Sequence, residues 1–355
     1  MKKIIKIETS NKNYNIVIQK NSILSAISAE EKFNKKIFII IDTKVSYKIK
    51  SLEKNKNFHF IKIKASEKIK SFEMYEKIIL MLLKLKIDRD STLIAIGGGT
   101  IGDLSGFIAN TIMRGVRYVL MPTTLLSQVD SSIGGKNGIN SRYGKNLIGT
   151  FFQPNKVIID TSILSTLPKK EIVSGYAEIL KHALIKDNNF YAWLKKNYSD
   201  IFKLKEPFIT KAIISSIKIK AYFVQMDEKE KLINSSSRAM LNFGHTFGHA
   251  LEALNSYSSK LSHGEAVAIG MALACKISFK KNLITKKDYY DLINHLKNVN
   301  LPFEDKRIKS PKLYNLMLMD KKNTNCKINL ILLQKIGVAY YERGLSKKEI
   351  KNYLI

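Results

Sequence analysis

The stretch that decides the fold is Thr92-Leu93-Ile94-Ala95-Ile96-Gly97-Gly98-Gly99-Thr100-Ile101-Gly102-Asp103. Its first part has the pattern of a buried strand, and the glycines that follow satisfy the spacing G-x-G-x-x-G. A strand-to-helix turn of this kind lets backbone amides and a helix N-terminus approach a pyrophosphate. The pattern alone is weak and also occurs in tight turns without a ligand, and no acidic residue ends a strand about 20 residues later, where a ribose is usually held. Asp42, at the end of an earlier strand pattern, is the better candidate for that contact.

Strand and helix patterns alternate on both sides of this stretch. Residues 74–85 have the i, i+3, i+4 apolar spacing of a helix, and strand-like runs occur at 36–41, 58–63, 118–121 and 157–159. Such alternation is typical of an α/β domain with a largely parallel sheet. After Pro168 helical patterns dominate, and one short run at 328–333 has the pattern of a strand returning to a sheet. The sequence therefore predicts an α/β domain over residues 1–168 and an all-α domain over residues 169–355.

The composition excludes several classes of protein. The chain has 355 residues, 45% of them hydrophobic, and a net charge of +30 that raises the question of nucleic-acid binding. Only seven of its 60 basic residues are arginines, and the lysines are scattered, so nucleic-acid binding is not expected as the main function. There is no apolar run of the roughly 18 residues that a membrane helix needs, no signal segment, and no cysteine framework. We expect a cytoplasmic protein without a membrane partner.

Histidines gather in one part of the predicted helical domain. His245 and His249 are four residues apart, so on a helix they share a face, and His263 follows shortly after them. A carboxylate from another helix would complete a nitrogen and oxygen site for a divalent metal such as zinc, and Glu178, which shares a helix face with Lys181, is the candidate. Each histidine alone fits a structural role equally well. The spacing does not tell which two of them would bind a metal.

A third set of residues is basic. Its members lie next to glycine turns or close to the histidines, and they are Arg114, Lys136, Lys145 with the neighbouring Asn146, Lys181, Lys220 and Arg238. In a chain so rich in lysine, each of them alone is more often a solvated charge than a ligand. Their placement together nevertheless predicts a pocket for an anionic substrate.

From about Ile39 to Gly337 the chain resembles the 3-dehydroquinate synthase family. The motifs that carry the resemblance are residues 97–103, 121–136, 144–149, 175–181, 242–250 and 261–265. The resemblance implies a Rossmann-like NAD-binding α/β domain, a helical domain with a catalytic divalent metal, zinc or cobalt, and a homodimer. It also implies conversion of 3-deoxy-D-arabino-heptulosonate 7-phosphate to 3-dehydroquinate and phosphate in the shikimate pathway of aromatic amino acid biosynthesis.

The resemblance assigns roles residue by residue. It implies that the metal ligands are Glu178, His245 and His263. The residues that it places at NAD are Asp42, Glu67, Lys70, Gly98, Gly99, Asp103, Thr123 and Thr124, with Asp130, Lys136 and Lys145 shared with the substrate pocket. The residues that it places at the substrate are Lys136, Asn146, Lys181, Lys220, Arg238, Asn242 and His249. It places Arg114 at the substrate phosphate of the same or the neighbouring subunit, and one of Lys321 and Lys322 over that phosphate.

Two segments depart from the pattern of the family. Residues 231–237 are longer than expected and lack the usual glycine, and Asn325-Cys326 stands where a glycine is usual. Three other functions compete with the one implied. A metal-dependent polyol dehydrogenase would share the glycine turn but would need no anion pocket, another sugar phosphate cyclase would differ at the substrate carboxylate, and a basic nucleic-acid-binding protein would bind in a salt-dependent way.

Overall fold

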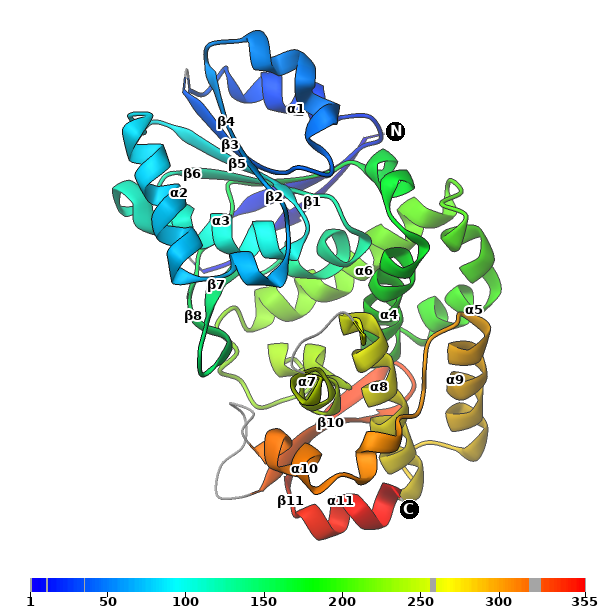
Figure 1. Cartoon of the computed structure of the whole chain (residues 1–355). Coiled ribbons are helices and arrows are strands. Elements are labelled where there is room, and N and C mark those ends of the chain that lie inside the picture. The colour runs from blue at the N-terminus through cyan, green and yellow to red at the C-terminus, as the bar shows by residue number, and fades with distance from the viewer. Residues whose placement is uncertain (1, 11, 35, 256–259, 319–326, 355) are drawn as a thin grey trace. The chain divides into compact units, whose positions relative to one another are not determined.

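The structure is a computed structural model that describes all residues except 1, 11, 35, 256–259, 319–326 and 355. By its internal contacts the chain divides into two compact units, Met1–Leu167 and Pro168–Ile355. Figure 1 shows that the first unit is built around a sheet and that the second is made mainly of helices. We describe each unit by itself.

Unit 1 contains a seven-stranded sheet in the order β1-β2-β9-β6-β5-β3-β4. Its strands are β1 (Lys3–Ile7), β2 (Tyr14–Ile18), β3 (Ile37–Asp42), β4 (Phe58–Ile63), β5 (Thr92–Gly97), β6 (Arg117–Pro122) and β9 (Lys156–Ile159). Strands β1 and β2 pair antiparallel, and all other pairs are parallel. The predicted α/β class with a largely parallel sheet is confirmed.

The middle of this sheet is apolar because both of its faces are covered. Every residue of β3 and of β5 is buried, which is why both strands read as continuous apolar runs rather than as alternating patterns. The helices of the unit are α1 (Ile23–Glu30), α2 (Phe72–Lys84) and α3 (Gly99–Thr111). The predicted helix over 74–85 is α2, which begins after Ser71, whose hydroxyl accepts a hydrogen bond from Met74 N at 3.2 Å.

The chain order places a switch point between β3 and β5. From β3 the chain continues to its neighbour β4 on one side, and from β4 it returns through α2 to β5 on the other side of β3. In parallel sheets of this kind, ligands bind beyond the carboxyl ends of the two strands at such a point. In this unit those ends are Asp42 of β3 and Gly97 of β5.

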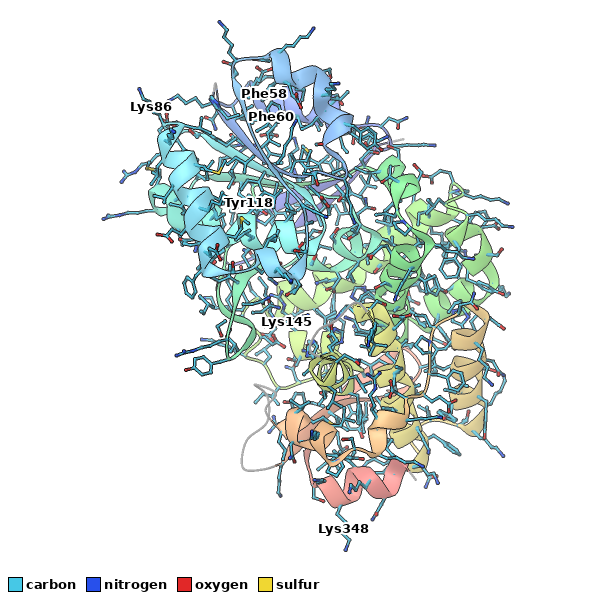
Figure 2. The ribbon with its side chains drawn as sticks, in the orientation of Figure 1. Phe58, Phe60, Lys86, Tyr118, Lys145 and Lys348 are labelled. Atoms are coloured by element: carbon cyan, nitrogen blue, oxygen red, sulfur yellow. The ribbon has the colours of Figure 1, made fainter. Side chains whose placement is uncertain are left out.

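The sequence analysis did not find the antiparallel hairpin of β7 (Lys136–Ser141) and β8 (Gly144–Phe151). Figure 2 labels Lys145 on this hairpin. It also labels Tyr118, whose buried hydroxyl joins β6 to α3 by donating to Gly102 O at 3.0 Å. The hairpin carries glycines and polar residues and has no continuous apolar run. Its strands pair at Gly138 and Gly149, where an added Cβ would lie 2.4 Å and 2.1 Å from backbone oxygens of the opposite strand.

Unit 2 is mainly helical, and no helix in the described ranges of the chain is long and apolar enough to cross a membrane. Its helices are α4 (Lys169–Lys186), α5 (Asn188–Phe202), α6 (Phe208–Met226), α7 (His245–Leu254), α8 (His263–Lys280), α9 (Lys286–Asn298), α10 (Pro311–Leu318) and α11 (Lys347–Leu354). The predicted helical character of this part of the chain is confirmed, and a two-stranded sheet adds to the helices. Strand β10 (Ile328–Lys335), at the predicted strand run, pairs antiparallel with β11 (Val338–Leu345) inside this unit, and does not return to the large sheet.

Candidate active site

Unit 1 has a candidate binding region at the carboxyl edge of its sheet. Parallel pairing of β3, β5 and β6 brings Asp42, the glycine turn and Thr123 to the same edge. Asp42 is 8% exposed and accepts from the backbone amide of Lys44 at 3.1 Å. Thr123 N donates to Gly97 O at 2.9 Å, so the two chain segments are joined directly beyond the strands.

The glycine turn leads straight into α3. Gly98 is the N-cap of the helix, and the first helical residue is Gly99. An added Cβ at Gly98 would lie 3.1 Å from Thr124 Cγ2, and one at Gly99 would lie 3.1 Å from Ser131 Oγ. Glycine therefore keeps the approach to the amides at the start of α3 open, and those amides are suited to a phosphate anion.

A cluster of charged and amide side chains lies beside this turn. Lys70 is 4% exposed, its Nζ lies 2.6 Å from Asp103 Oδ2, and it also contacts Asn146 Oδ1. Glu67 accepts from Asn140 Nδ2 at 2.8 Å and lies 4.0 Å from Lys145 Nζ. The structure therefore brings together predicted residues from β8, from α3 and from the segment after β4, which are up to 79 positions apart in sequence.

Three more predicted residues belong to unit 1. Asp130 is half-buried on the π-helical turn η4 (Ser127–Ser131), and Lys136 is exposed at the start of β7. Arg114 is exposed at the end of the 3-10 helix η3 (Ile112–Arg114), with a positive φ of 63°. Their roles at a substrate stay predictions.

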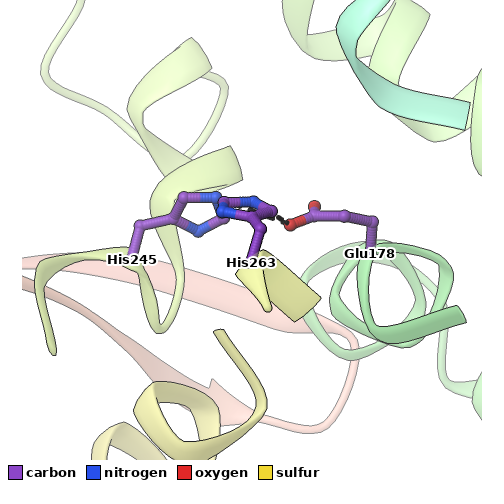
Figure 3. A group of neighbouring side chains, drawn as sticks. All are labelled: Glu178, His245 and His263. Carbon is purple, nitrogen blue, oxygen red and sulfur yellow. Dashed lines mark hydrogen bonds and ion pairs between the residues drawn. The ribbon is translucent and has the colours of Figure 1, made fainter. Parts of the chain in front are cut away.

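Unit 2 contains a cluster formed by Glu178, His245 and His263, shown in Figure 3. Glu178 comes from the middle of α4 and is completely buried, while the two histidines begin α7 and α8. Glu178 Oε1 lies 3.2 Å from Nε2 of His263 and 3.5 Å from Nε2 of His245. One ligand atom from each residue can thus be chosen so that all lie within 4.8 Å of one another.

Local sequence explains why both histidines reach Glu178. Gly244 has a φ of +78°, and an added Cβ there would lie 2.7 Å from Met271 N, so only glycine fits the turn before His245. Ser262 and Glu265 form a capping box that starts α8 at His263. Gly264 lies so close to α4 that an added Cβ would be 2.3 Å from Ser174 O. This contact brings the start of α8 against the helix that carries Glu178.

The donor set fits a divalent metal. His245 Nδ1 lies 3.2 Å from Phe243 O, and His263 Nδ1 lies 3.4 Å from Glu252 Oε2, so in both rings the second nitrogen has its own acceptor. With a metal bound at Nε2, these acceptors would hold the proton on Nδ1 of each ring and orient the ring toward Glu178. Two imidazoles and a carboxylate with an open position are typical ligands of catalytic zinc.

Electrostatics at the cluster agree with a cation between these groups. Burial, together with the charge of Lys181, holds the pKa of His245 well below its usual value, so that ring is neutral at pH 7. Burial also lowers the pKa of His263, but its contacts with Glu178 and Glu252 outweigh burial and raise the pKa to about 10. A carboxylate beside this ring therefore stabilises a positive charge at the position where a metal ion would lie.

The sequence analysis missed Glu252, which is the partner of His263 Nδ1. It lies on α7, seven residues after His245, so it occupies the same side of the helix. That spacing is the signal that could have identified it. His249, three residues before Glu252, is exposed, and its ring centroid lies 5.1 Å from that of His245. The structure thus places His249 beside the cluster.

Four other predicted residues lie in unit 2, and one of them contacts this cluster. Lys181 is 1% exposed and pairs with Glu178 Oε2, one turn earlier on α4. Arg238 and Asn242 begin and end the 3-10 helix η6 (Arg238–Asn242), which contacts both α4 and α6, and Lys220 is buried on α6. The structure therefore gathers three buried cations in one unit. Lys321 and Lys322, and the departure at Asn325-Cys326, lie outside the described residues.

Comparison with known proteins agrees with this geometry. A family model described as 3-dehydroquinate synthase N-terminal matches residues 60–174, and one described as 3-dehydroquinate synthase C-terminal matches residues 175–323. A 3-dehydroquinate synthase of Pelagibacter ubique is 44% identical over 364 residues, covering 99% of this chain and 97% of that protein. One of Desulforamulus reducens is 38% identical over 356 residues, covering 98% of each.

Solved structures show the same fold. A 2-epi-5-epi-valiolone synthase from Streptomyces hygroscopicus subsp. jinggangensis, with NAD+ and Zn2+ bound, has a TM-score of 0.88 and 25% identity, and covers 98% of this chain and 97% of its own. A 2-deoxy-scyllo-inosose synthase complexed with carbaglucose-6-phosphate, NAD+ and Co2+ has a TM-score of 0.83 at 24% identity, with 99% and 98% covered. Because both family models match and the sequence relatives align over nearly the whole chain, the chain belongs to the 3-dehydroquinate synthase family.

Proposed function

We infer that the protein is a 3-dehydroquinate synthase, an NAD- and metal-dependent lyase that converts 3-deoxy-D-arabino-heptulosonate 7-phosphate to 3-dehydroquinate and phosphate. The observation that carries this inference is the 44% identity over 99% of the chain to a protein with that activity, with the metal donor set present. In this reaction a ring hydroxyl is first oxidised to a ketone. The ketone acidifies the neighbouring C–H, so that phosphate leaves by elimination, and the ketone is then reduced again. The ring of the resulting enol ether opens, and an intramolecular aldol step closes the new ring.

Each cofactor supplies one kind of chemistry. When bound, NAD supplies a reversible hydride acceptor, and the divalent metal supplies a Lewis acid that lowers the pKa of a substrate hydroxyl. We propose that Glu178, His245 and His263 hold the metal. The glycine turn, Asp42, Thr123, Thr124 and the Lys70 cluster support binding of NAD at the sheet edge of unit 1, where helix amides favour a pyrophosphate.

The chain's own cations account for recognition of an anionic sugar acid. Arg238 is 3% exposed and Lys181, which pairs with Glu178, is 1% exposed, and buried cations of this kind suit the carboxylate or phosphate of a substrate. We propose that these residues, with Lys220, Asn242, Lys136 and Asn146, hold the substrate carboxylate and hydroxyls. His249, exposed beside the metal cluster, would move a proton at a substrate hydroxyl. For the ring closure these residues need supply chiefly orientation.

The test is release of inorganic phosphate from the seven-carbon substrate. We expect release to require NAD and to stop after a chelator removes the metal, without accumulation of NADH. Accumulation of NADH with a simple polyol would instead indicate a dehydrogenase of the same fold. If the protein turned over a sugar phosphate without a carboxylate and did not turn over the seven-carbon acid, it would be another sugar phosphate cyclase. That result would contradict the proposal.

Two further predictions concern the oligomeric state and the location of the protein in the cell. We propose that the protein is a homodimer, in which Arg114, exposed on η3, reaches the substrate phosphate of the neighbouring subunit. Sedimentation analysis gives the oligomeric state, and mixing an Arg114→Ala chain with a chain inactivated at the metal site tests for a shared site. We also propose a cytoplasmic location, which fractionation of cells that express the protein would test.

A further inference from the structure

The segment between α6 and η6 is the departure that the sequence analysis noted at residues 231–237. Its tip is exposed, since residues 231–235 all lie at the surface and Ile233 is 60% exposed. Its two ends are buried, since Asp227 is 6% exposed and Arg238 is 3% exposed. The tip of the loop is therefore exposed to solvent, while its two ends, at Asp227 and Arg238, are buried.

Asp227 joins the two ends of this loop. On the outgoing side its carboxylate accepts from the backbone amides of Lys231 at 2.7 Å and Leu232 at 3.2 Å. On the returning side its Oδ2 accepts from the hydroxyl of Ser237 at 3.2 Å and from the backbone amide of Arg238 at 3.1 Å. One carboxylate thus holds both the start of the loop and the residue at which η6 begins.

The neighbours of Asp227 hold the side chains that follow the loop. Glu228 O accepts from Arg238 Nη1 at 2.7 Å, so the guanidinium is anchored to the residue next to Asp227. Glu230 Oε1 accepts from Asn242 Nδ2 at 2.8 Å, at the other end of η6. The segment from Asp227 to Glu230 therefore orients two residues that the proposed function places at the substrate.

We propose that Asp227 is the positioning residue for Arg238, and that it keeps this arginine at the anionic substrate by joining the two ends of the exposed loop. This inference rests on the proposed function, because that function assigns Arg238 to the substrate. The physical reason is that a buried backbone amide needs an acceptor. Without the carboxylate, the amide of Arg238 would have to move toward water, and the guanidinium would move with it.

A purely structural role of Asp227 makes a different prediction. If the carboxylate only stabilised unit 2, its loss would lower the melting temperature and would disturb the proposed metal ligands of the same unit together with substrate binding. If it acts through Arg238, its loss raises the KM for the heptulosonate phosphate and leaves metal content and NAD affinity unchanged. It also loses its effect once Arg238 has been removed, because residues that act through each other are not additive.

The experiment is a double-mutant cycle on the full chain loaded with metal and NAD, with Asp227→Ala, Arg238→Ala and the double variant. We expect Asp227→Ala to raise the substrate KM by about tenfold, a change of about 1.4 kcal/mol in binding, and to add less than about twofold in the Arg238→Ala background. Ile233→Ser, at the exposed tip of the same loop, is the control and should leave KM unchanged. If Asp227→Ala does not fold, Asp227→Asn, which keeps one acceptor oxygen, replaces it in the cycle.

Different results overturn different statements. Asp227→Ala could raise KM by the same factor in the original chain and in the Arg238→Ala variant, or it could reduce metal content and NAD affinity as well. Either result would show that Asp227 does not act through Arg238. An unchanged KM in Arg238→Ala itself would instead contradict the assignment of this arginine in the proposed function.

Discussion

Glu252 of α7 and His263 of α8 contact each other through Glu252 Oε2 and His263 Nδ1, which lie 3.4 Å apart. The other ring nitrogen of His263 lies 3.2 Å from Glu178 Oε1. The imidazole is therefore held between two carboxylates from different helices, one of which would be a metal ligand and the other its support. Such pairs orient the ring and raise its basicity as a ligand.

Removal of a proposed metal ligand should remove the metal without unfolding the chain. Glu178→Gln and His245→Ala each delete one of the three donors, and we expect both to lose bound metal and phosphate release while the circular dichroism spectrum is retained. Metal analysis after dialysis is the measurement. Unchanged metal content in both variants would remove the proposed site.

Glu252→Gln should weaken the metal without abolishing its binding. Because Glu252 contacts the ring and not the proposed ion, we expect the metal dissociation constant to rise about 10- to 100-fold. Competition with a chromophoric chelator measures this constant. Glu265→Gln, at the capping box beside the same histidine, is the control: it alters the start of α8 but not His263 Nδ1. Equal weakening in both variants would indicate a general effect on α8.

Gly98→Ala should weaken NAD binding and leave the metal in place. Its Cβ would lie 3.1 Å from Thr124 Cγ2 and would occupy the approach to the first amides of α3. We expect about a tenfold rise in the NAD dissociation constant, measured by calorimetry. Gly102→Ala is the matched control in the same helix, since its Cβ would meet Leu120 Cδ1 at 3.4 Å, an ordinary contact. A similar loss in both variants would contradict a specific role of the turn.

His295 should make the stability of the protein depend on pH. Burial, with a smaller effect of Lys195, lowers its pKa to about 4, while the usual value is 6.5. The folded state therefore binds this proton less readily than the unfolded state, so stability is fully present above about pH 6.5 and falls as the pH decreases toward 4. The full loss from this group is about 3 kcal/mol.

The measurement for His295 is the free energy of unfolding in urea at pH 7.5 and at pH 5.0. His295→Gln should reduce the difference between the two values. Tyr176→Phe removes the hydroxyl that lies 2.8 Å from His295 Nε2 but keeps the ring buried, so it should lower stability while the dependence on pH remains. An unchanged difference in His295→Gln would show that other groups cause the dependence.

Several features of this fold could be predicted from the sequence because each depends on residues that are adjacent in the chain. The all-buried strand Thr92–Gly97 needs apolar residues at every position, and the glycine turn after it needs a residue without Cβ, so both leave a pattern in the sequence. The hairpin β7–β8 left no such pattern, because close backbone approach at Gly138 and Gly149 replaces side-chain packing there. The β10–β11 pairing was missed since a strand pattern does not specify its partner.

The sequence by itself determined the candidate residue types: a carboxylate and three histidines in the second half of the chain, a glycine turn in the first half, and cations in both halves. Only the tertiary structure decided which of them meet. It joined Glu178 to His245 and His263, added Glu252 as the support of one ring, and placed Asp227 at both ends of the loop before Arg238. The physical reason is that contacts between helices depend on backbone approach, such as that of Gly264 to Ser174, and sequence spacing does not encode that approach.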